Sequence, residues 1–259
     1  MRRYFTMLVL PAMLLAGGVW GVLASAADTT TKTTAGQCVK DTNASPRFID
    51  NGDGTISDRT TCLMWEKKDD AGGVHDKDNL YTWSKCDQWP YCEPSGTAFT
   101  EFLAKLNTPP CFAGHCDWRL PKSAGRPDWG DAFGPTGQPP ELESIVDAPY
   151  PGFLVSTYDP ATERHSFPPT MCKDTPCVDP VFNNNCGAQS SGNRSCTADG
   201  KGGKACSCTL PQTYMSGSSF GQATSGAFPW SMVVVDFQRG WAMGTHKKAH
   251  GPVRAVRSM

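Results

Sequence analysis

The sequence predicts an α+β fold, with a mixed, mainly antiparallel sheet, two short helices and long disulfide-stapled loops. Segments with the pattern of β-strands stand near both ends of the chain, and two segments with helical spacing of apolar residues lie between them. Glycine and proline are abundant, with 26 and 21 of the 259 residues, which indicates many turns and irregular loops. Twelve cysteines, an even number, indicate that cross-links hold these loops.

Residues 1–26 are predicted to be a secretory signal peptide. Arg2 and Arg3 precede a long apolar run, and Ala24-Ser25-Ala26 supplies the small residues of a cleavage site. The mature protein would then begin at Ala27. The alternative is an uncleaved membrane anchor, because the apolar run is nearly long enough to cross a bilayer. With the signal removed, no membrane span is expected, and the protein is expected to be secreted, periplasmic or held at the cell surface.

The rest of the chain is expected to form one domain after a short leader. Residues 27–45 are polar and rich in threonine, without an apolar period, which indicates a flexible segment. The domain is expected to cover residues 46–259. It carries two cysteine-rich inserts, at 86–116 and 172–208.

The first elements are expected to be three strands joined by tight turns. The stretch "RFIDNGDGTISDRTTCLMWEK" (47–67) places glycines between short apolar runs, and glycine accepts the positive φ that tight turns need. The expected strands are Arg47–Asp50, Thr55–Asp58 and Leu63–Glu66.

A calcium loop is the alternative for the same stretch. Counting from Asp50, an EF-hand loop needs oxygen ligands where this chain has Gly52 and Gly54, and a glutamate where it has Thr61. The pattern therefore favours a hairpin without metal. A metal held by Asp50 or Asp53 across the turn remains the alternative.

The later elements follow from the spacing of apolar residues and from turn signals. Trp65, Trp83 and Trp118 are expected in the core or packed on a sheet, and the two ends of the domain are expected to meet in one sheet. Thr97 is expected to cap the first helix. The expected elements are a helix at Thr97–Leu106, a strand at 117–121 ("DWRLP"), a second helix at 141–147 ("ELESIVD"), a buried strand at 231–237 ("SMVVVDF") and a closing strand at 253–257 ("VRAVR").

The cysteines are expected to form disulfides rather than a metal site, because no zinc or haem spacing is present. Four local pairs suggest themselves: Cys86–Cys92, Cys111–Cys116, Cys172–Cys177 and Cys186–Cys196. Cys38 could pair with Cys62, while Cys206 and Cys208 could pair with each other or change the scheme. The spacing alone leaves the connectivity open. The twelve positions are Cys38, Cys62, Cys86, Cys92, Cys111, Cys116, Cys172, Cys177, Cys186, Cys196, Cys206 and Cys208.

Several blocks, in this order, resemble the Lcl C-terminal domain family, long described as a domain of unknown function. They are "RFIDNGDGTISDRTTCLMWEKKDDAGGVHDKDNLYTW", "DWRLP", "ELESIVD", "VDPVF", "VVVDFQRG" and "VRAVR". The resemblance implies a fold similar to C-type lectins, and the adhesin domain that names the family binds sulfated glycosaminoglycans. This chain departs from the family in having no collagen-like stalk, in Cys62 at a usual turn glycine and in Ala255 at a frequent cysteine. The sugar-binding signature of calcium-dependent lectins is absent.

Two groups of residues are candidates for binding a glycan. Arginine and lysine attract sulfate and carboxylate groups, and a basic cluster stands at the C-terminal end. Tryptophans on Gly/Pro-rich stretches could stack on a sugar ring. The candidate ligand residues are Lys247, Lys248, His250, Arg254, Trp129 and Trp230.

An acidic loop is a weaker candidate for calcium, since carboxylate oxygens are the ligands that calcium prefers. Its carboxylates are Asp69, Asp70, Asp76 and Asp78. A charged surface loop without metal is the alternative, and no cofactor is expected.

These patterns favour a lectin-like binding or adhesion module that recognises glycans, including sulfated or acidic ones, or a surface or extracellular protein. The alternative is a structural component of a cell-envelope or extracellular assembly. An enzyme ranks third, since His246 and His250 lack the glutamate of the zinc-protease motif. Nucleic acid is not an expected partner, because the net charge is −1. The sequence leaves the oligomeric state open.

Overall fold

The computed structural model describes residues 38–89, 91–123, 141–148, 157–159, 164–166, 172–184, 207–220 and 230–259. The expected signal peptide and Trp129 lie outside these residues, as does most of the expected leader. The chain divides into two units, Met1–Ala35 and Gly36–Met259, and all described residues belong to the second.

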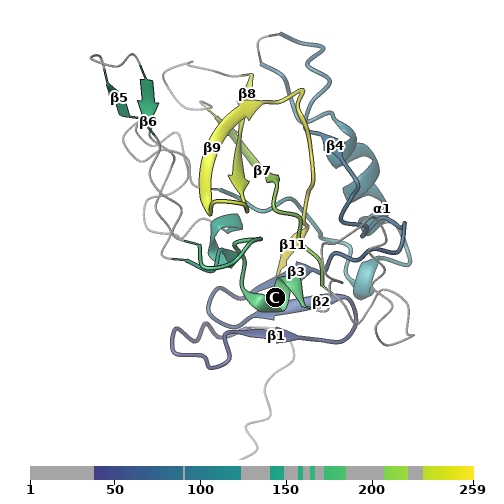
Figure 1. Ribbon diagram of the computed structural model, residues 1–259. Coiled ribbons are helices and arrows are strands. Elements are labelled where there is room, and N and C mark those ends of the chain that lie inside the picture. Colours follow the sequence, from purple (N-terminus) through teal and green to yellow (C-terminus); the bar gives the residue numbers. More distant parts are fainter. Residues whose placement is uncertain are drawn as a thin grey trace, which may run out of the picture. The chain divides into compact units, whose positions relative to one another are not determined.

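The predicted N-terminal strands are present and form an antiparallel sheet with the end of the chain (Figure 1). Strands β1 (Phe48–Asp50), β2 (Thr55–Asp58) and β3 (Leu63–Glu66) follow one another, and β11 (Val256–Ser258) pairs with β3, so the order is β1-β2-β3-β11. Val256 lies opposite Trp65 in this register. The prediction that both ends of the domain meet in one sheet is confirmed.

The turn between β1 and β2 is built from glycines and aspartates. Gly52 and Gly54 have φ of 73° and 95°, in the left-handed region that glycine enters without steric cost. Asp50 Oδ1 accepts a hydrogen bond from the Gly52 N–H at 2.9 Å, and Asp53 Oδ1 accepts one from the Thr55 N–H at 3.0 Å. The aspartates therefore bind the backbone of their own turn.

The remaining described strands are also paired antiparallel. The buried strand expected at 231–237 is β8, which ends at Asp236 and forms the centre of its sheet. The three sheets consist of β7 (Thr213–Phe220), β8 (Ser231–Asp236) and β9 (Trp241–His246); of β4 (Tyr81–Thr82) and β10 (His250–Gly251); and of β5 (Thr157–Asp159) and β6 (Arg164–Ser166).

The first helix is confirmed, but its cap is not the one expected. It begins with a π-helical segment, η1 (Ala98–Leu103), and continues as α1 (Ala104–Asn107). The Thr97 side chain makes no capping hydrogen bond. Its hydroxyl instead accepts from the Thr82 N–H at 2.9 Å, and the Thr97 N–H donates to Thr82 Oγ1 at 3.1 Å, so Thr97 ties the helix to β4.

Three expected elements are shorter than the sequence pattern indicates. The strand expected at 117–121 is a single bridge between Arg119 and Val256. The helix expected at 141–147 is one 3₁₀ turn, η5 (Leu142–Ile145). The closing strand begins at Val256, because residues 253–255 pack into the core as an irregular segment. The other 3₁₀ turns are η2 (Phe112–Gly114) and η6 (Pro180–Asn183).

Two clusters of buried side chains form the core. In the first, the Phe182 ring contacts Phe48 and Trp65 edge-to-face, with centroids 5.1 and 6.1 Å away. In the second, Trp83 packs edge-to-face on Phe99 at 5.3 Å. Edge-to-face aromatic pairs are favourable beyond their area burial. The predicted burial of Trp65, Trp83 and Trp118 is confirmed.

Disulfides staple the loops as expected, and no described cysteine is free. Cys208 is also disulfide-bonded. The suggested pair Cys186–Cys196 and residue Cys206 lie outside the described residues. The confirmed pairs are Cys38–Cys62, Cys86–Cys92, Cys111–Cys116 and Cys172–Cys177. Such cross-links fit a protein of an oxidising, extracellular environment.

Candidate functional site

Exposed aromatic rings gather at the loop closed by the Cys86–Cys92 disulfide. Trp89 and Tyr91 lie on this loop with exposed fractions of 62% and 66%. The Trp89 ring stacks on Trp230, with centroids 5.3 Å apart and planes at 23°, and on His246, at 5.9 Å and 10°. We call Trp89, Tyr91, Trp230 and His246 the aromatic platform.

The loop is too short to bury its own aromatic rings. The N–H groups of Tyr91 and Cys92 both donate to the Gln88 carbonyl, at 2.9 and 3.3 Å, which closes a tight turn next to the disulfide. The Cys86 N–H donates to the Ser84 hydroxyl at 2.9 Å and holds the start of the loop. These hydrogen bonds and the disulfide restrain the described residues of the loop, and restraint of this kind lowers the entropy cost of binding.

Further contacts link the chain segments that carry the aromatic platform. The Lys247 N–H donates to the Trp230 carbonyl at 2.8 Å, and the Ser84 N–H donates to the Lys247 carbonyl at 3.0 Å. The Lys247 ammonium lies 4.6 Å from the centre of the Trp83 ring, a cation–π contact. These contacts join the segment that carries Trp89 to the one that carries Trp230 and His246.

The expected basic cluster does not form an exposed surface. Lys247 is 2% exposed, and burial lowers the pKa of its ammonium group. Arg254 is fully buried. Of the four candidate residues in the basic cluster, only Lys248 and His250 are exposed. Arg257, another basic residue at this end of the chain, pairs with Asp117 at 2.7 Å. The expected exposure of the basic side chains therefore holds for Lys248 and His250 and is wrong for Lys247 and Arg254.

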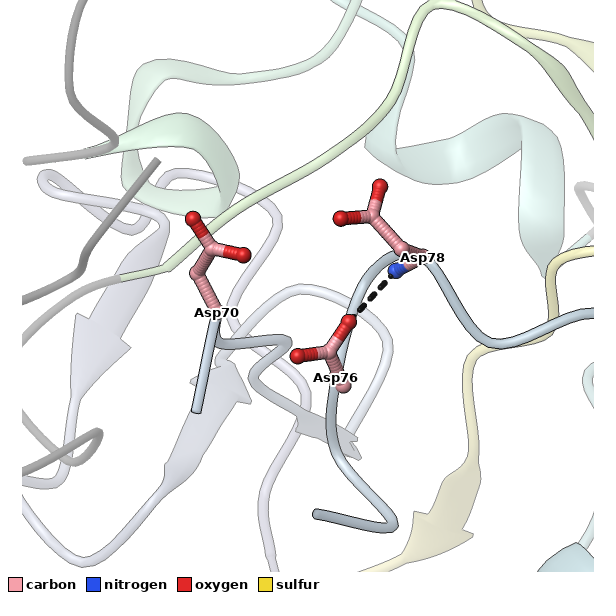
Figure 2. A group of neighbouring side chains, drawn as sticks. All are labelled: Asp70, Asp76 and Asp78. Atoms are coloured by element: carbon pink, nitrogen blue, oxygen red, sulfur yellow. Dashed lines mark hydrogen bonds between the residues drawn. The ribbon is translucent and has the colours of Figure 1, made fainter. Parts of the chain in front are cut away.

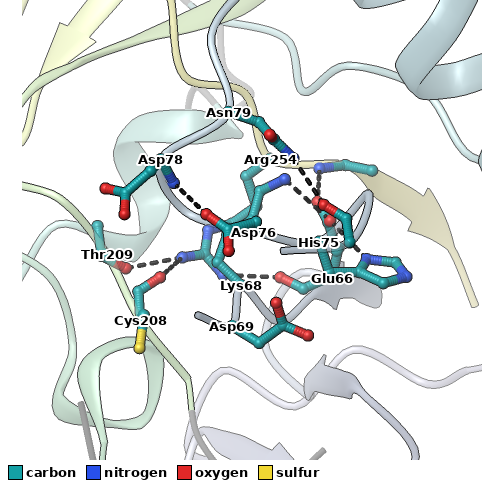
Figure 3. A network of polar contacts seen from close by, with 12 residues as sticks. Glu66, Lys68, Asp69, His75, Asp76, Asp78, Asn79, Cys208, Thr209 and Arg254 are labelled. Atoms are coloured by element: carbon teal, nitrogen blue, oxygen red, sulfur yellow. Dashed lines mark hydrogen bonds and ion pairs between the residues drawn. The ribbon is translucent and has the colours of Figure 1, made fainter. Parts of the chain in front are cut away.

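Arg254 instead belongs to a buried polar network, drawn in Figure 3. Its guanidinium donates to the Glu66 carbonyl at 2.7 Å, to the Cys208 carbonyl at 3.1 Å and to Thr209 Oγ1 at 2.7 Å. A buried guanidinium has five donors to satisfy, and backbone carbonyls satisfy part of them. Arg254 thus joins β3 to the segment at 207–210.

Glu66 supplies the negative charge of this network. Its carboxylate lies 3.0 Å from the buried Lys68 ammonium and 2.8 Å from His75 Nδ1, and it accepts from the Ala255 N–H at 2.9 Å. Burial acts to raise the pKa of Glu66, but Lys68 and His75 outweigh it and hold the pKa below its ordinary value. The network has a structural role, because its charged groups pair with one another and not with a ligand.

The acidic loop brings three of its four aspartates together, as Figure 2 shows. One oxygen from each of Asp70, Asp76 and Asp78 lies within 4.8 Å of the others. The Lys77 ammonium binds Asp70 at 2.7 Å and Asp78 at 2.5 Å, so this cluster already holds a cation of its own. Asp69 is not part of the cluster, and burial raises its pKa.

Backbone donors engage the third carboxylate of the cluster. Asp76 accepts from the N–H groups of Gly72 and Asp78, at 2.7 and 2.8 Å. Burial acts to lower the pKa of Lys77, but its hydrogen bonds to Asp70 and Asp78 outweigh burial and raise it. The carboxylates suit calcium chemically, yet Lys77 takes the position between two of them.

A polar groove lies next to β4. It has a volume of about 480 Å³ and is open to solvent. The loop at 72–74 forms one wall, the η1–α1 helix forms another, and β4 with His250 of β10 forms the rest. The helix contributes Glu101 and Lys105, and the segment before β4 contributes Asn79 and Leu80. A cavity of this size suits a small polar ligand.

Comparisons with known proteins do not identify this chain. No protein-family model matches it, no curated protein matches it, and no solved structure matches it. The function must therefore be argued from the site itself. Within the described residues, no helix has the length and apolar character needed to cross a membrane.

Sequence reasoning found one member of the platform and missed the rest. Trp230 is half-buried and stacked, in keeping with its candidacy as a stacking residue, whereas the candidate Trp129 lies outside the described residues. Trp89 and Tyr91 were missed. The signal for them is present in "CDQWPYC" (86–92), because a loop with two aromatic residues between paired cysteines has no interior in which to bury them.

Proposed function

We propose that this protein is an exported, disulfide-stapled module that binds carbohydrate through the aromatic platform and is not an enzyme. One observation carries the proposal. Among residues whose burial is described, Trp89 and Tyr91 are the only exposed tryptophan, tyrosine or phenylalanine side chains, and both lie on the loop closed by the Cys86–Cys92 disulfide. Leaving such rings in water costs roughly 1–2 kcal/mol each, which a ligand regains by covering them.

A pyranose ring suits this surface better than a polyanion. One face of the ring presents C–H groups that pack on indole, while its hydroxyls require hydrogen-bonding groups at the edge. Gln88 and Glu93 are exposed neighbours of the platform along the chain and offer such groups. The burial of Lys247 and Arg254 removes the main argument for a sulfated ligand.

We also propose that the fold is C-type-lectin-like and related to the Lcl C-terminal domain family. The sequence blocks given above support this relation. So do the sheet that joins both ends of the domain, the helix between them and the stapled loops. Recognition would not require calcium, because the Lys77 ammonium already bridges two carboxylates of the acidic loop. The disulfides support export to the cell surface, the periplasm or the medium.

A glycan array with the oxidised full chain tests the proposal. We expect binding to uncharged glycans that persists at high salt and in EDTA, since stacking needs neither ion pairs nor metal. Trp89→Ala should abolish binding. Val39→Ala, which removes another exposed apolar side chain, serves as the matched control and should leave binding intact.

A structural role is the second candidate, because exposed aromatic rings also anchor protein–protein interfaces. An array without signal, together with a partner protein whose binding Trp89→Ala abolishes, would establish that role. Binding that disappears with salt and survives Trp89→Ala would instead indicate a charged site elsewhere.

A further inference from the structure

The polar groove is lined by charged side chains that have no hydrogen-bonding or ionic partner among the described residues. Glu101 and Lys105 lie one helical turn apart and are exposed. Neither side chain, nor that of His250, forms a hydrogen bond or ion pair with another described residue. An acceptor and a donor thus face the same cavity, and both can bind a ligand without first breaking an internal bond.

The groove and the aromatic platform are neighbours through the backbone. His250 lines the groove and pairs with Thr82 of β4, while His246 belongs to the platform. Only three residues lie between the two histidines, so their Cα atoms are at most about 14 Å apart. The Ala249 N–H donates to the His246 carbonyl at 2.8 Å, a turn that shortens this separation further. A short oligosaccharide spans such a distance.

We infer that the platform and the groove are two subsites of one site, and that its ligand is an oligosaccharide rather than a single sugar. This inference rests on the proposed function and specifies its ligand class. One ring stacks on Trp89, and the chain continues past the turn at 247–249 into the groove.

The groove residues match the chemistry of a second sugar. The Glu101 carboxylate accepts hydrogen bonds from hydroxyls, and bonds to a charged acceptor are stronger than those to a neutral one. The Lys105 ammonium donates to hydroxyl and carbonyl oxygens. Leu80, 53% exposed on the groove, packs on the C–H face of the ring. The mixed charge of Glu101 and Lys105 favours an uncharged sugar over an acidic one.

Calorimetric titration with oligomers of defined length tests the inference. The probes are glucose, N-acetylglucosamine and their β-linked dimers to tetramers, added to the oxidised full chain. We expect the affinity of the wild type to rise at least tenfold from monomer to tetramer. The double variant Glu101→Gln/Lys105→Met should lose this rise while it keeps the affinity for the monomer. Trp89→Ala should lose both.

The controls separate the inference from the proposed function. Lys40→Met changes an exposed lysine outside the groove and should behave as wild type, and melting curves should show all variants folded. If the double variant keeps the full rise with length, the groove is not a subsite and the inference is wrong, while the proposed function stands. If no oligomer binds the wild type at any length, the proposed function itself fails.

Discussion

At the scale of single residues, the structure depends on charges buried in pairs. Glu66, Lys68 and Arg254 are removed from water, which costs several kcal/mol for each ion before partners are counted. Glu66 faces Lys68 at 3.0 Å and binds the Ala255 N–H at 2.9 Å, so it stabilises the strand and the chain end together. Removing Glu66 would leave a buried ammonium without its counter-ion.

We predict that Glu66→Gln lowers the free energy of unfolding by about 3 kcal/mol, since breaking one member of a buried pair is strongly destabilising. For a domain of this size the melting temperature should fall by roughly 10 °C. Glu101→Gln, an exposed glutamate, is the control and should change it by less than about 2 °C. Equal melting temperatures for Glu66→Gln and wild type would show that the network contributes no stability.

Cys62 carries a backbone conformation that suits glycine. Its φ is 58°, in the left-handed region, where a side chain costs roughly 1–2 kcal/mol. In a background of Cys38→Ala, which removes the disulfide, we predict that Cys62→Gly is more stable than Cys62→Ala by about 1 kcal/mol. Urea denaturation of the two double variants measures this difference. A more stable alanine variant would mean that the backbone relaxes at this position.

At the scale of elements, the acidic loop is partly balanced by a lysine of its own. The buried Lys77 ammonium binds Asp70 and Asp78, and Asp76 accepts from two backbone N–H groups. The loop therefore combines high acidity with an internal counter-charge. In the β1–β2 hairpin, too, aspartates bind groups of their own segment, because Asp50 and Asp53 accept hydrogen bonds from its N–H groups.

We predict that calcium has little effect on stability, and that Lys77→Met lowers the free energy of unfolding by about 2 kcal/mol by leaving carboxylates unpaired. Thermal melts of the wild type in EDTA and in excess calcium should agree within about 2 °C. Stabilisation by calcium of more than about 5 °C would show a bound ion through linkage and contradict this account.

The sequence predicted those elements that local patterns determine. Turn glycines and short apolar runs were sufficient for β1, β2 and β3, because the β1–β2 and β2–β3 pairs join residues within twenty positions of each other. The residue at which β11 begins and the hydrogen-bond partner of Thr97 were not predictable in this way. Thr97 makes a hydrogen bond with Thr82, and the residues before β11 lie in the core, where Arg254 donates to the Glu66 carbonyl. No local sequence pattern encodes either contact.

At the scale of the whole molecule, buried carboxylates couple stability to pH. Lys68 and His75 lower the pKa of Glu66 against the effect of burial, and Arg119 lowers that of Glu141 in the same way. A carboxylate with a lowered folded pKa stabilises the fold above its ordinary value of 4.5, and this contribution is lost as the pH falls through the folded pKa. Asp69, whose pKa burial raises, acts in the opposite direction.

We predict that the melting temperature is nearly constant between about pH 7 and pH 5 and falls steeply below about pH 4. Glu66→Gln should flatten this fall, because the variant has no proton to bind at that position. Melting curves at a series of pH values provide the test. The same acid dependence in wild type and variant would mean that other carboxylates control it.

The candidate site shows where sequence reasoning reaches its limit. A basic run at the chain end has the composition of an anion site, but Arg254 reaches partners 45 and 188 residues away in sequence, and these contacts take it out of solvent. The platform joins Trp89 with Trp230 and His246 across similar separations. Composition shows which residues are present, whereas long-range pairing decides which of them face solvent.

The central claim is that sugar rings stack on Trp89 at the aromatic platform. The most direct measurement is the NMR spectrum of isotope-labelled tryptophan indoles in the oxidised full chain, titrated with the β-linked tetramer of N-acetylglucosamine and then of glucose. Trp89→Phe and Trp230→Phe assign the two platform signals. We predict that the signals of Trp89 and Trp230 shift saturably with one of these sugars while that of the buried Trp65 stays fixed. Platform signals that do not move, with either sugar at concentrations well above those of a typical lectin site, would contradict the claim.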